Sequence, residues 1–203
     1  MNVTHTIALL MPEATLGGIP EPVPWHVANP PEPPREARTV LAALLFSDII
    51  ASCEKQAAIG DRAWRDLVHA HHSTVRAALA HWEGTEHDTA GDGFFASFVC
   101  PGWAISCACE IGRRVAHLGL TTRAGVHIGE CEIIDGKPGG LAVTVAARAM
   151  AVARPHEVIV TRTVKDLVAG SGFDFVDRGE HDFKGLPEHW HLYAAAPRRR
   201  SCA

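Results

Sequence analysis

An apolar run from Leu41 to Ile50 carries an aspartate, Asp48, close to its end. Such a run predicts a buried strand, where a carboxylate is costly unless it is paired or bound to a cation. A second aspartate, Asp92, follows 44 positions later between Gly91 and Gly93. That pattern favours a tight hairpin turn between two strands. If the two strands are neighbours, the two carboxylates converge on one site.

The aspartate pair suggests a divalent-cation site. Two hard oxygen ligands, with water and phosphate completing the shell, are the usual way in which proteins bind Mg²⁺. The alternative is that each aspartate is an ordinary turn or strand-end residue.

Composition indicates a globular chain. Of its 203 residues, 47% are hydrophobic and 21% are charged, as expected for one full core plus a tail. A net charge of −4 gives no sign of nucleic acid or an acidic membrane surface as a partner.

The six cysteines fit neither a zinc site nor a disulfide framework. They favour reduced thiols and a cytoplasmic location, and no run reaches membrane-spanning length.

Seven prolines between residues 18 and 38 predict an extended segment. We therefore expect an N-terminal extension with a Pro-rich linker (1–38), one domain (39–196) and a basic tail (197–203).

Within the domain, periodicity and turn residues predict alternating strands and helices. The order favours an α+β fold with a mixed, mostly antiparallel sheet and helices on its outer face. The expected strands are 39–50, the two arms of an 85–98 hairpin, 121–134, 157–161, 173–183 and 189–195. The expected helices are a broken one over 52–82 and others at 101–118, 141–153 and 162–169. A Gly/Pro turn is expected at 135–140.

Five segments that follow one another along the domain resemble the class III nucleotidyl cyclases, above all the bacterial adenylate cyclase type. The resemblance covers roughly residues 40 to 195 and implies the ferredoxin-like, palm-type cyclase fold. The segments are Phe46-Ser47-Asp48-Ile49, Thr89 to Phe94 around Gly91-Asp92-Gly93, Arg123 to Glu130, Val143 to Arg148, and Phe183-Lys184-Gly185.

The resemblance implies conversion of ATP to 3′,5′-cyclic AMP and pyrophosphate by two-metal catalysis. Asp48 and Asp92, helped by the backbone carbonyl of Ile49, would hold two divalent ions, Mg²⁺ or Mn²⁺. Arg148 would steady charge on the transferring phosphorus, and Lys184 would bind the triphosphate. The resemblance also implies a homodimer, in which the aspartates of one chain meet Arg148 and Lys184 of the other. Alternatively, Arg148 is a solvated helix cation and Lys184 an ordinary turn lysine.

The N–H groups of Ile50, Ala51, Ser52 and Cys53 are expected to cradle phosphates, because they lie at a helix start. The same segment departs from the Gly-Ser-Thr-like loop of the family, and Ala51 narrows the backbone φ range.

Three further positions depart from the family pattern. Asp88 stands where adenylate cyclases usually carry a base-reading Lys, and Lys137 stands where they carry Asp or Thr. Thr144 replaces the ribose-orienting Asn and has a shorter reach.

Asp88 and Lys137 reverse the charges of the usual base-reading pair, and hydrogen-bond matching indicates which base they suit. Adenine presents an acceptor at N1 and a donor at N6, whereas guanine presents a donor at N1 and an acceptor at O6. Asp88 with Lys137 therefore suits guanine better, although the two side chains could also pair with each other. A one-residue shift in the Gly/Pro turn could instead place Asp135 at the base-reading position of Lys137.

ATP is the expected substrate, from the adenylate cyclase resemblance. The alternatives are a cyclase that prefers GTP, or a weak or inactive cyclase-like domain that binds nucleotide and regulates. A diguanylate cyclase is a less favoured alternative, because the sequence lacks the Gly-Gly-Asp/Glu-Glu-Phe hairpin that is the signature of those enzymes.

Overall fold

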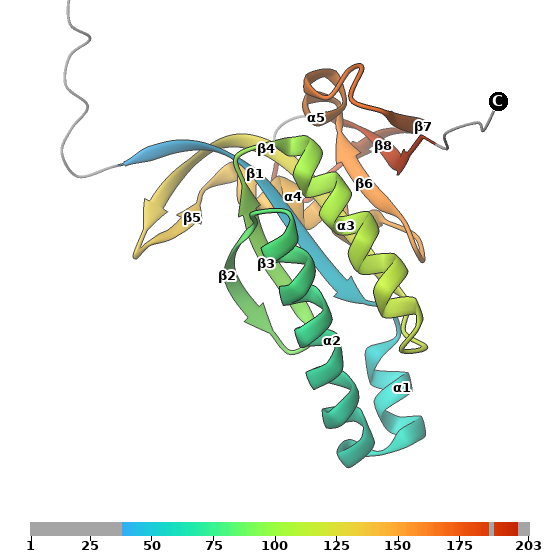
Figure 1. The fold of residues 1–203 in the computed structure, drawn as a ribbon. Coiled ribbons are helices and arrows are strands. Elements are labelled where there is room, and N and C mark those ends of the chain that lie inside the picture. Colours follow the sequence, from blue (N-terminus) through green and yellow to red (C-terminus); the bar gives the residue numbers. More distant parts are fainter. Residues whose placement is uncertain (1–37, 187–188, 199–203) are drawn as a thin grey trace, which may run out of the picture. The chain divides into compact units, whose positions relative to one another are not determined.

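The computed structural model describes residues 38–186 and 189–198. Except for Arg38, Pro197 and Arg198, the expected extension and basic tail lie outside the described residues. The elements follow in this order (Figure 1): β1 (Thr39–Ile49), α1 (Ser52–Ile59), α2 (Asp61–His81), β2 (Thr85–Ala90), β3 (Gly93–Phe98), α3 (Pro101–Ala116), β4 (Thr122–Ile134), β5 (Lys137–Gly139), α4 (Leu141–Val152), β6 (Val158–Thr161), α5 (Arg162–Leu167), β7 (Phe173–Asp182) and β8 (His189–Pro197).

The described residues form one eight-stranded sheet in the order β2-β3-β1-β4-β6-β8-β7, with β5 paired to β4. Strands β4 and β6 run parallel, and the other neighbouring pairs run antiparallel. The predicted α+β fold with a mixed, mostly antiparallel sheet is therefore confirmed.

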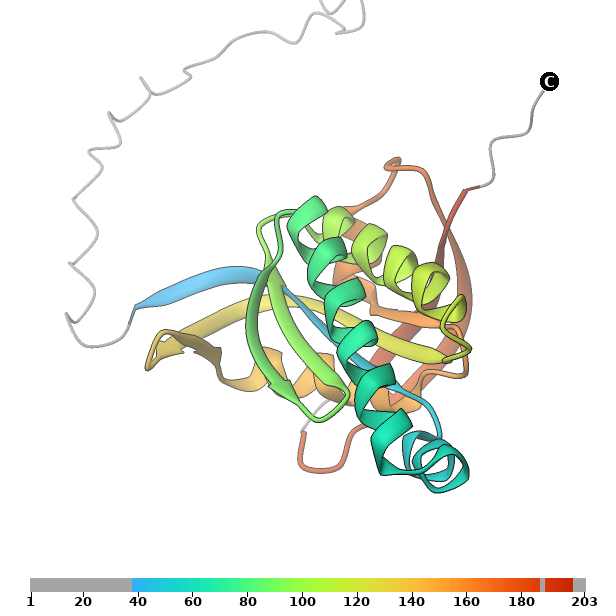
Figure 2. The same cartoon turned by 60° about the horizontal axis from the view of Figure 1, so that its bottom comes forward.

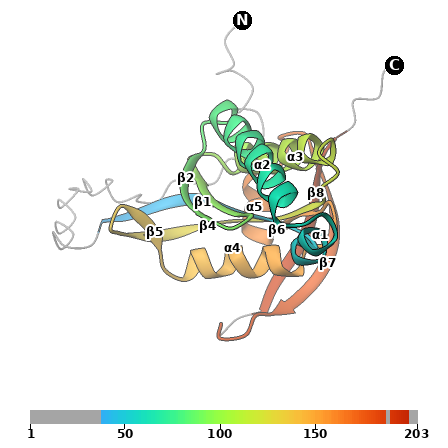
Figure 3. The ribbon, with the colours of Figure 1, turned by 90° about the horizontal axis from the view of Figure 1, so that it is seen from below.

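Helices cover both faces of the sheet. Helices α2 and α3 run side by side across one face (Figure 2), and α4 lies against β1 and β4 on the other (Figure 3). The alternation along β1 explains both layers. Ala43 and Leu45 pack in the core under α2 and α3, whereas Ala42 and Leu44 pack with residues of α4.

The close approach of α4 to the sheet depends on Gly125 in β4. A Cβ atom at this position would lie 2.2 Å from the backbone nitrogen of Met150 and 2.6 Å from the carbonyl oxygen of Ala146. Both atoms belong to α4, so the absence of a side chain at Gly125 sets the distance between this helix and the sheet.

The expected turn at 135–140 is wrong in part, because Lys137–Gly139 forms the short strand β5. Asp135 and Gly136 make the turn, both with positive φ (51° and 79°), as type I′ hairpins require. Pro138 argued against a strand, but β5 is an edge strand, where a missing N–H is tolerated.

Of the helices formed by residues 38–186 and 189–198, none combines the length and apolar character needed to cross a lipid bilayer.

Candidate active site

The two aspartates lie close together in the structure. Asp48 is near the end of β1, and Asp92 occupies the β2–β3 turn beside it, because β1 pairs with β3 up to the Ser47–Phe94 pair. The backbone N–H of Ile49 donates to Oδ2 of Asp92 at 3.3 Å. Burial and then the negative charge of Asp48 raise the pKa of Asp92 above its usual value. Two carboxylates that repel each other in this way form a natural cation site.

The donor chemistry fits a divalent ion. Carboxylate oxygens are the ligands that Mg²⁺ and Mn²⁺ prefer. Residues 38–186 and 189–198 contain no group of three or more His, Cys, Asp or Glu side chains that could hold a metal ion. Protein carbonyls, water and phosphate oxygens would therefore complete the coordination shell of an ion held by Asp48 and Asp92.

A basic side chain that was not singled out from the sequence, Arg123, lies against Asp48. Its guanidinium donates to Oδ2 of Asp48 at 3.1 Å and to the carbonyl of Ala151 in α4 at 3.2 Å. The contact follows from strand register, because Arg123 is directly opposite Asp48 in the β1–β4 ladder. Arg123 therefore offers the site a fixed positive charge.

The expected phosphate loop is only partly available. The N–H of Ile50 donates to the carbonyl of Thr121 at 2.8 Å, so Ile50 does not offer a free donor. Ala51 adopts the left-handed conformation (φ 55°, ψ 38°) immediately before α1. Ser52 and Cys53 begin this helix, and first-turn N–H groups have no partner within a helix. These two amides remain candidates for binding phosphate.

A β-bulge between Glu86 and Asp88 determines where Asp88 points. Glu86 is opposite Ala96, whereas Asp88 is opposite Phe95. Ala96 belongs to the core under α2 and α3, and Phe95 to the cluster beside α4. The bulge therefore turns Asp88 toward the face that carries Asp48, a common use of bulges near functional sites.

Asp88 and Asp48 line the same cleft of about 480 Å³, which α4 borders through Val143 and Met150. Nζ of Lys137 lies 3.5 Å from Oδ2 of Asp88, with the two side chains 53% and 61% exposed. The other oxygen of Asp88 accepts the N–H of Thr89 at 2.9 Å. The pairing of Asp88 with Lys137, one of the alternatives for these residues, is therefore present in this chain.

Thr144 and Arg148 lie one turn apart on α4, and both are exposed. Lys184 is exposed in the connection between β7 and β8. Within the described part of the chain, the ion pairs include none that joins Arg148 or Lys184 to a carboxylate. The single chain thus brings the aspartates together but presents Thr144, Arg148 and Lys184 to solvent.

Comparisons with known proteins agree with this geometry. Residues 36–195 match the family described as "Adenylate and Guanylate cyclase catalytic domain". A Rhizobium meliloti (strain 1021) protein named "Putative adenylate cyclase 3" is 28% identical over 128 residues. That match covers 59% of this chain but only 22% of the relative, so the chain spans a small part of its length.

Solved structures with the same fold include the adenylyl cyclase CyaB from P. aeruginosa, at 19% identity and a TM-score of 0.75. The alignment covers 81% of this chain and 98% of that one. The guanylate cyclase domain of RhGC from Catenaria anguillulae, in complex with GTP, aligns at 15% identity and a TM-score of 0.72. It covers 80% of this chain and 100% of that one.

Proposed function

The chain belongs to the family of adenylate and guanylate cyclase catalytic domains, and on this premise we propose that it converts ATP to 3′,5′-cyclic AMP and pyrophosphate. The reaction would require two divalent ions, Mg²⁺ or Mn²⁺, and a homodimer. The proposed catalytic domain is residues 39–196, in a cytoplasmic protein that acts on a nucleotide rather than on nucleic acid or a membrane.

The observation that carries the proposal is the proximity of Asp48 and Asp92. The charge of Asp48 contributes to the raised pKa of Asp92, so the two carboxylates lie within each other's field at the cost of mutual repulsion. A fold keeps such a pair when a cation relieves the repulsion, and active sites are where perturbed pKa values gather.

In the proposed reaction, the ribose 3′-oxygen attacks the α-phosphorus of the same nucleotide. The new 3′-O–P bond forms as the bond to pyrophosphate breaks, and the hydroxyl proton passes to water. Asp48, Asp92 and the carbonyl of Ile49 would hold the divalent ions, which would supply Lewis-acid polarisation of the attacking and leaving oxygens.

The protein's own groups would position the nucleotide and stabilise its charge. The N–H groups of Ser52 and Cys53, with Ala51 shaping the loop, would bind phosphate oxygens. Arg123 already lies beside Asp48 and would compensate negative charge on the triphosphate. Thr144 would orient the ribose through its hydroxyl group.

A second subunit would supply the remaining cations. Arg148 and Lys184 are exposed, whereas stabilising a transferring phosphoryl group requires cations at the phosphate oxygens. In the proposed homodimer, Arg148 and Lys184 of one subunit face Asp48 and Asp92 of the other.

A second candidate function is favoured by the ion pair between Asp88 and Lys137. Their arrangement matches O6 and N1–H of guanine better than N6 and N1 of adenine. Because each side chain already has the other as partner, the pair could also leave the base unread. The domain would then prefer GTP, or bind nucleotide in a regulatory role with weak or no turnover.

The decisive experiment measures cyclic AMP and cyclic GMP formation by the full chain, with ATP or GTP and with Mg²⁺ or Mn²⁺, at high protein concentration. We expect cyclic AMP from the wild type and none from Asp48→Asn. Nucleotide binding measured on the same samples distinguishes the candidates. If both proteins bind nucleotide equally and neither forms product, the cyclase proposal is wrong and the regulatory one stands.

A further inference from the structure

Consecutive histidines of α2 bind consecutive carbonyl groups of the turn that carries Asp92. Nε2 of His71 lies 3.2 Å from the carbonyl oxygen of Asp92. Nε2 of His72 lies 2.8 Å from the carbonyl oxygen of Gly91. Because a carbonyl oxygen only accepts, both Nε2 atoms carry the hydrogen. The two bonds fix the orientation of both peptide groups at the turn.

The β2–β3 ladder anchors this turn at its base through the Ala90–Gly93 pair, and Gly91 lies exposed in the turn itself. Gly91 has a φ of 63°, and a side chain at this position would meet no atom within 4 Å. A side chain at Gly91 would thus face open space, and glycine has more backbone freedom to lose on folding than any other residue. The histidine bonds add a restraint on the peptide groups of the turn from the side of α2.

Phe94, next to the turn in β3, holds both imidazole rings in place. It is 4% exposed. The rings of His71 and His72 meet it edge-on, with centroids 5.7 Å and 5.1 Å away. The guanidinium carbon of Arg76, one turn further along α2, lies 5.7 Å from the same ring centroid. These contacts dock one face of α2 onto the hairpin.

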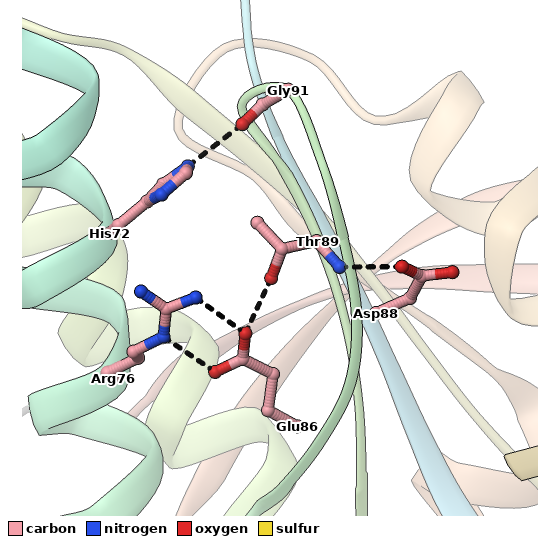
Figure 4. Close-up of polar contacts among 6 residues, drawn as sticks. All are labelled: His72, Arg76, Glu86, Asp88, Thr89 and Gly91. Atoms are coloured by element: carbon pink, nitrogen blue, oxygen red, sulfur yellow. Dashed lines mark hydrogen bonds and ion pairs between the residues drawn. The ribbon is translucent and has the colours of Figure 1, made fainter. Parts of the chain in front are cut away.

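From Arg76 a second set of bonds leads to Asp88 (Figure 4). Nε and Nη2 of Arg76 donate to the two carboxylate oxygens of Glu86 at 2.9 and 2.8 Å. The hydroxyl of Thr89 donates to Glu86 at 2.6 Å. The N–H of the same threonine donates to Oδ1 of Asp88 at 2.9 Å. A bidentate arginine–carboxylate pair is geometrically restrictive, so it holds Thr89, and through it Asp88, in one orientation.

We propose that α2 positions both halves of the site through separate contacts: His72 fixes the turn that presents Asp92 to the metal, and Arg76, through Glu86 and Thr89, orients Asp88 toward the base. The inference rests on the proposed function, because it assigns these side chains to a site for metal and nucleotide. His72 and Arg76 are positioning residues and touch neither ligand.

His72 is the better residue to test, because it is half-buried whereas His71 is fully buried. Its replacement should leave the core intact. His72→Gln keeps an N–H donor near the position of Nε2, so it should preserve the bond that His72→Ala removes. Ser73→Ala is a matched control on the same helix, since the Ser73 hydroxyl donates within α2 to the carbonyl of His69 and has no other partner among the described residues.

The experiment titrates Mn²⁺ into the full chain with a non-hydrolysable ATP analogue and follows the electron paramagnetic resonance signal of the free ion, so that no turnover is needed. We expect His72→Ala to weaken Mn²⁺ binding about three- to tenfold, the effect of losing one hydrogen bond. His72→Gln and Ser73→Ala should bind within about twofold of the wild type.

Arg76→Ala should leave Mn²⁺ affinity unchanged but alter the ratio of ATP to GTP affinities, measured by competition with a fluorescent nucleotide. Equal weakening of Mn²⁺ binding by Arg76→Ala and His72→Ala would overturn the proposal, because general docking of α2 would then explain both. Wild-type affinity in His72→Ala would also overturn it. If Asp92→Asn binds Mn²⁺ as the wild type does, the metal site itself, and with it the proposed function, is wrong.

Discussion

Lys137 and Asp88 form an ion pair within one chain, with Nζ 3.5 Å from Oδ2. The pair joins two elements that the sequence separates by almost fifty positions, the β2–β3 hairpin and the short strand β5. Because both side chains are more than half exposed, the pair contributes little to stability. Under the proposed function, the pair would present a donor and an acceptor to a nucleobase.

Exchanging the two residues should change base selection. In the double variant Asp88→Lys and Lys137→Asp, the donor and acceptor change places and match N1 and N6 of adenine. Once a bound base covers these side chains, a mismatched polar group costs about 1–3 kcal/mol. We therefore expect the ratio of kcat/KM for ATP to that for GTP to rise about tenfold or more over the wild type. An unchanged ratio would mean that this pair does not read the base.

Removing the charge of Asp92 should stabilise the metal-free protein. Because its pKa is raised in the folded state, folding favours the protonated form. The free energy of unfolding should then fall as the pH rises through the raised pKa, and stay lower above it. Asp92→Asn should raise the thermal midpoint at neutral pH in a chelator. Asp66→Asn, on the exposed side of α2, should have little effect, and a lowered midpoint for Asp92→Asn would contradict the electrostatic account.

Two glycine substitutions should act in opposite directions. A side chain at Gly125 would collide with the backbone of α4, so Gly125→Ala should destabilise the fold by about 3 kcal/mol and displace Arg148. A side chain at Gly112 in α3 meets Thr122 at an ordinary 3.7 Å, so Gly112→Ala should stabilise by about 0.5–1 kcal/mol. Urea unfolding measures both, and equal effects would refute the packing argument.

Relief of backbone strain should follow from Ala51→Gly. Ala51 has a φ of 55° and a ψ of 38°, and a left-handed alanine costs about 1–2 kcal/mol. Glycine removes that cost but loses more entropy on folding, so the net gain should be at most about 1 kcal/mol. Ala57→Gly, inside α1, should lose about 1 kcal/mol in the same urea titration. A loss for both variants would mean that the position before α1 is not strained.

Much of the fold could be predicted from the sequence, because its signals are local. The apolar run that carries Asp48 and the glycines around Asp92 predicted the strands of the candidate metal site with bounds close to those observed. Strand β5 was missed because Pro138 argues against a strand, and tolerance of proline at an edge depends on neighbours that the sequence does not reveal. The Ala-rich helix α4 has small residues on several sides, so its position opposite α2 and α3 was not evident.

The site was less predictable where it depends on pairing between distant strands. Arg123 meets Asp48 only because of the β1–β4 register. The N–H of Ile50 is engaged by Thr121, which no local pattern indicates. The sequence left open whether Asp88 and Lys137 pair, because the bulge that turns Asp88 depends on how β2 aligns with β3.

The central claim is that each active site combines Asp48 and Asp92 of one subunit with Arg148 and Lys184 of another. Mixing two inactive variants, Asp92→Asn and Arg148→Ala, tests it directly. Random exchange of subunits would make half of the dimers mixed, each with one intact site, so about a quarter of the wild-type cyclase activity should return. If the mixture stays as inactive as either variant alone while mixed dimers are detected, the site lies within one chain and the account is wrong.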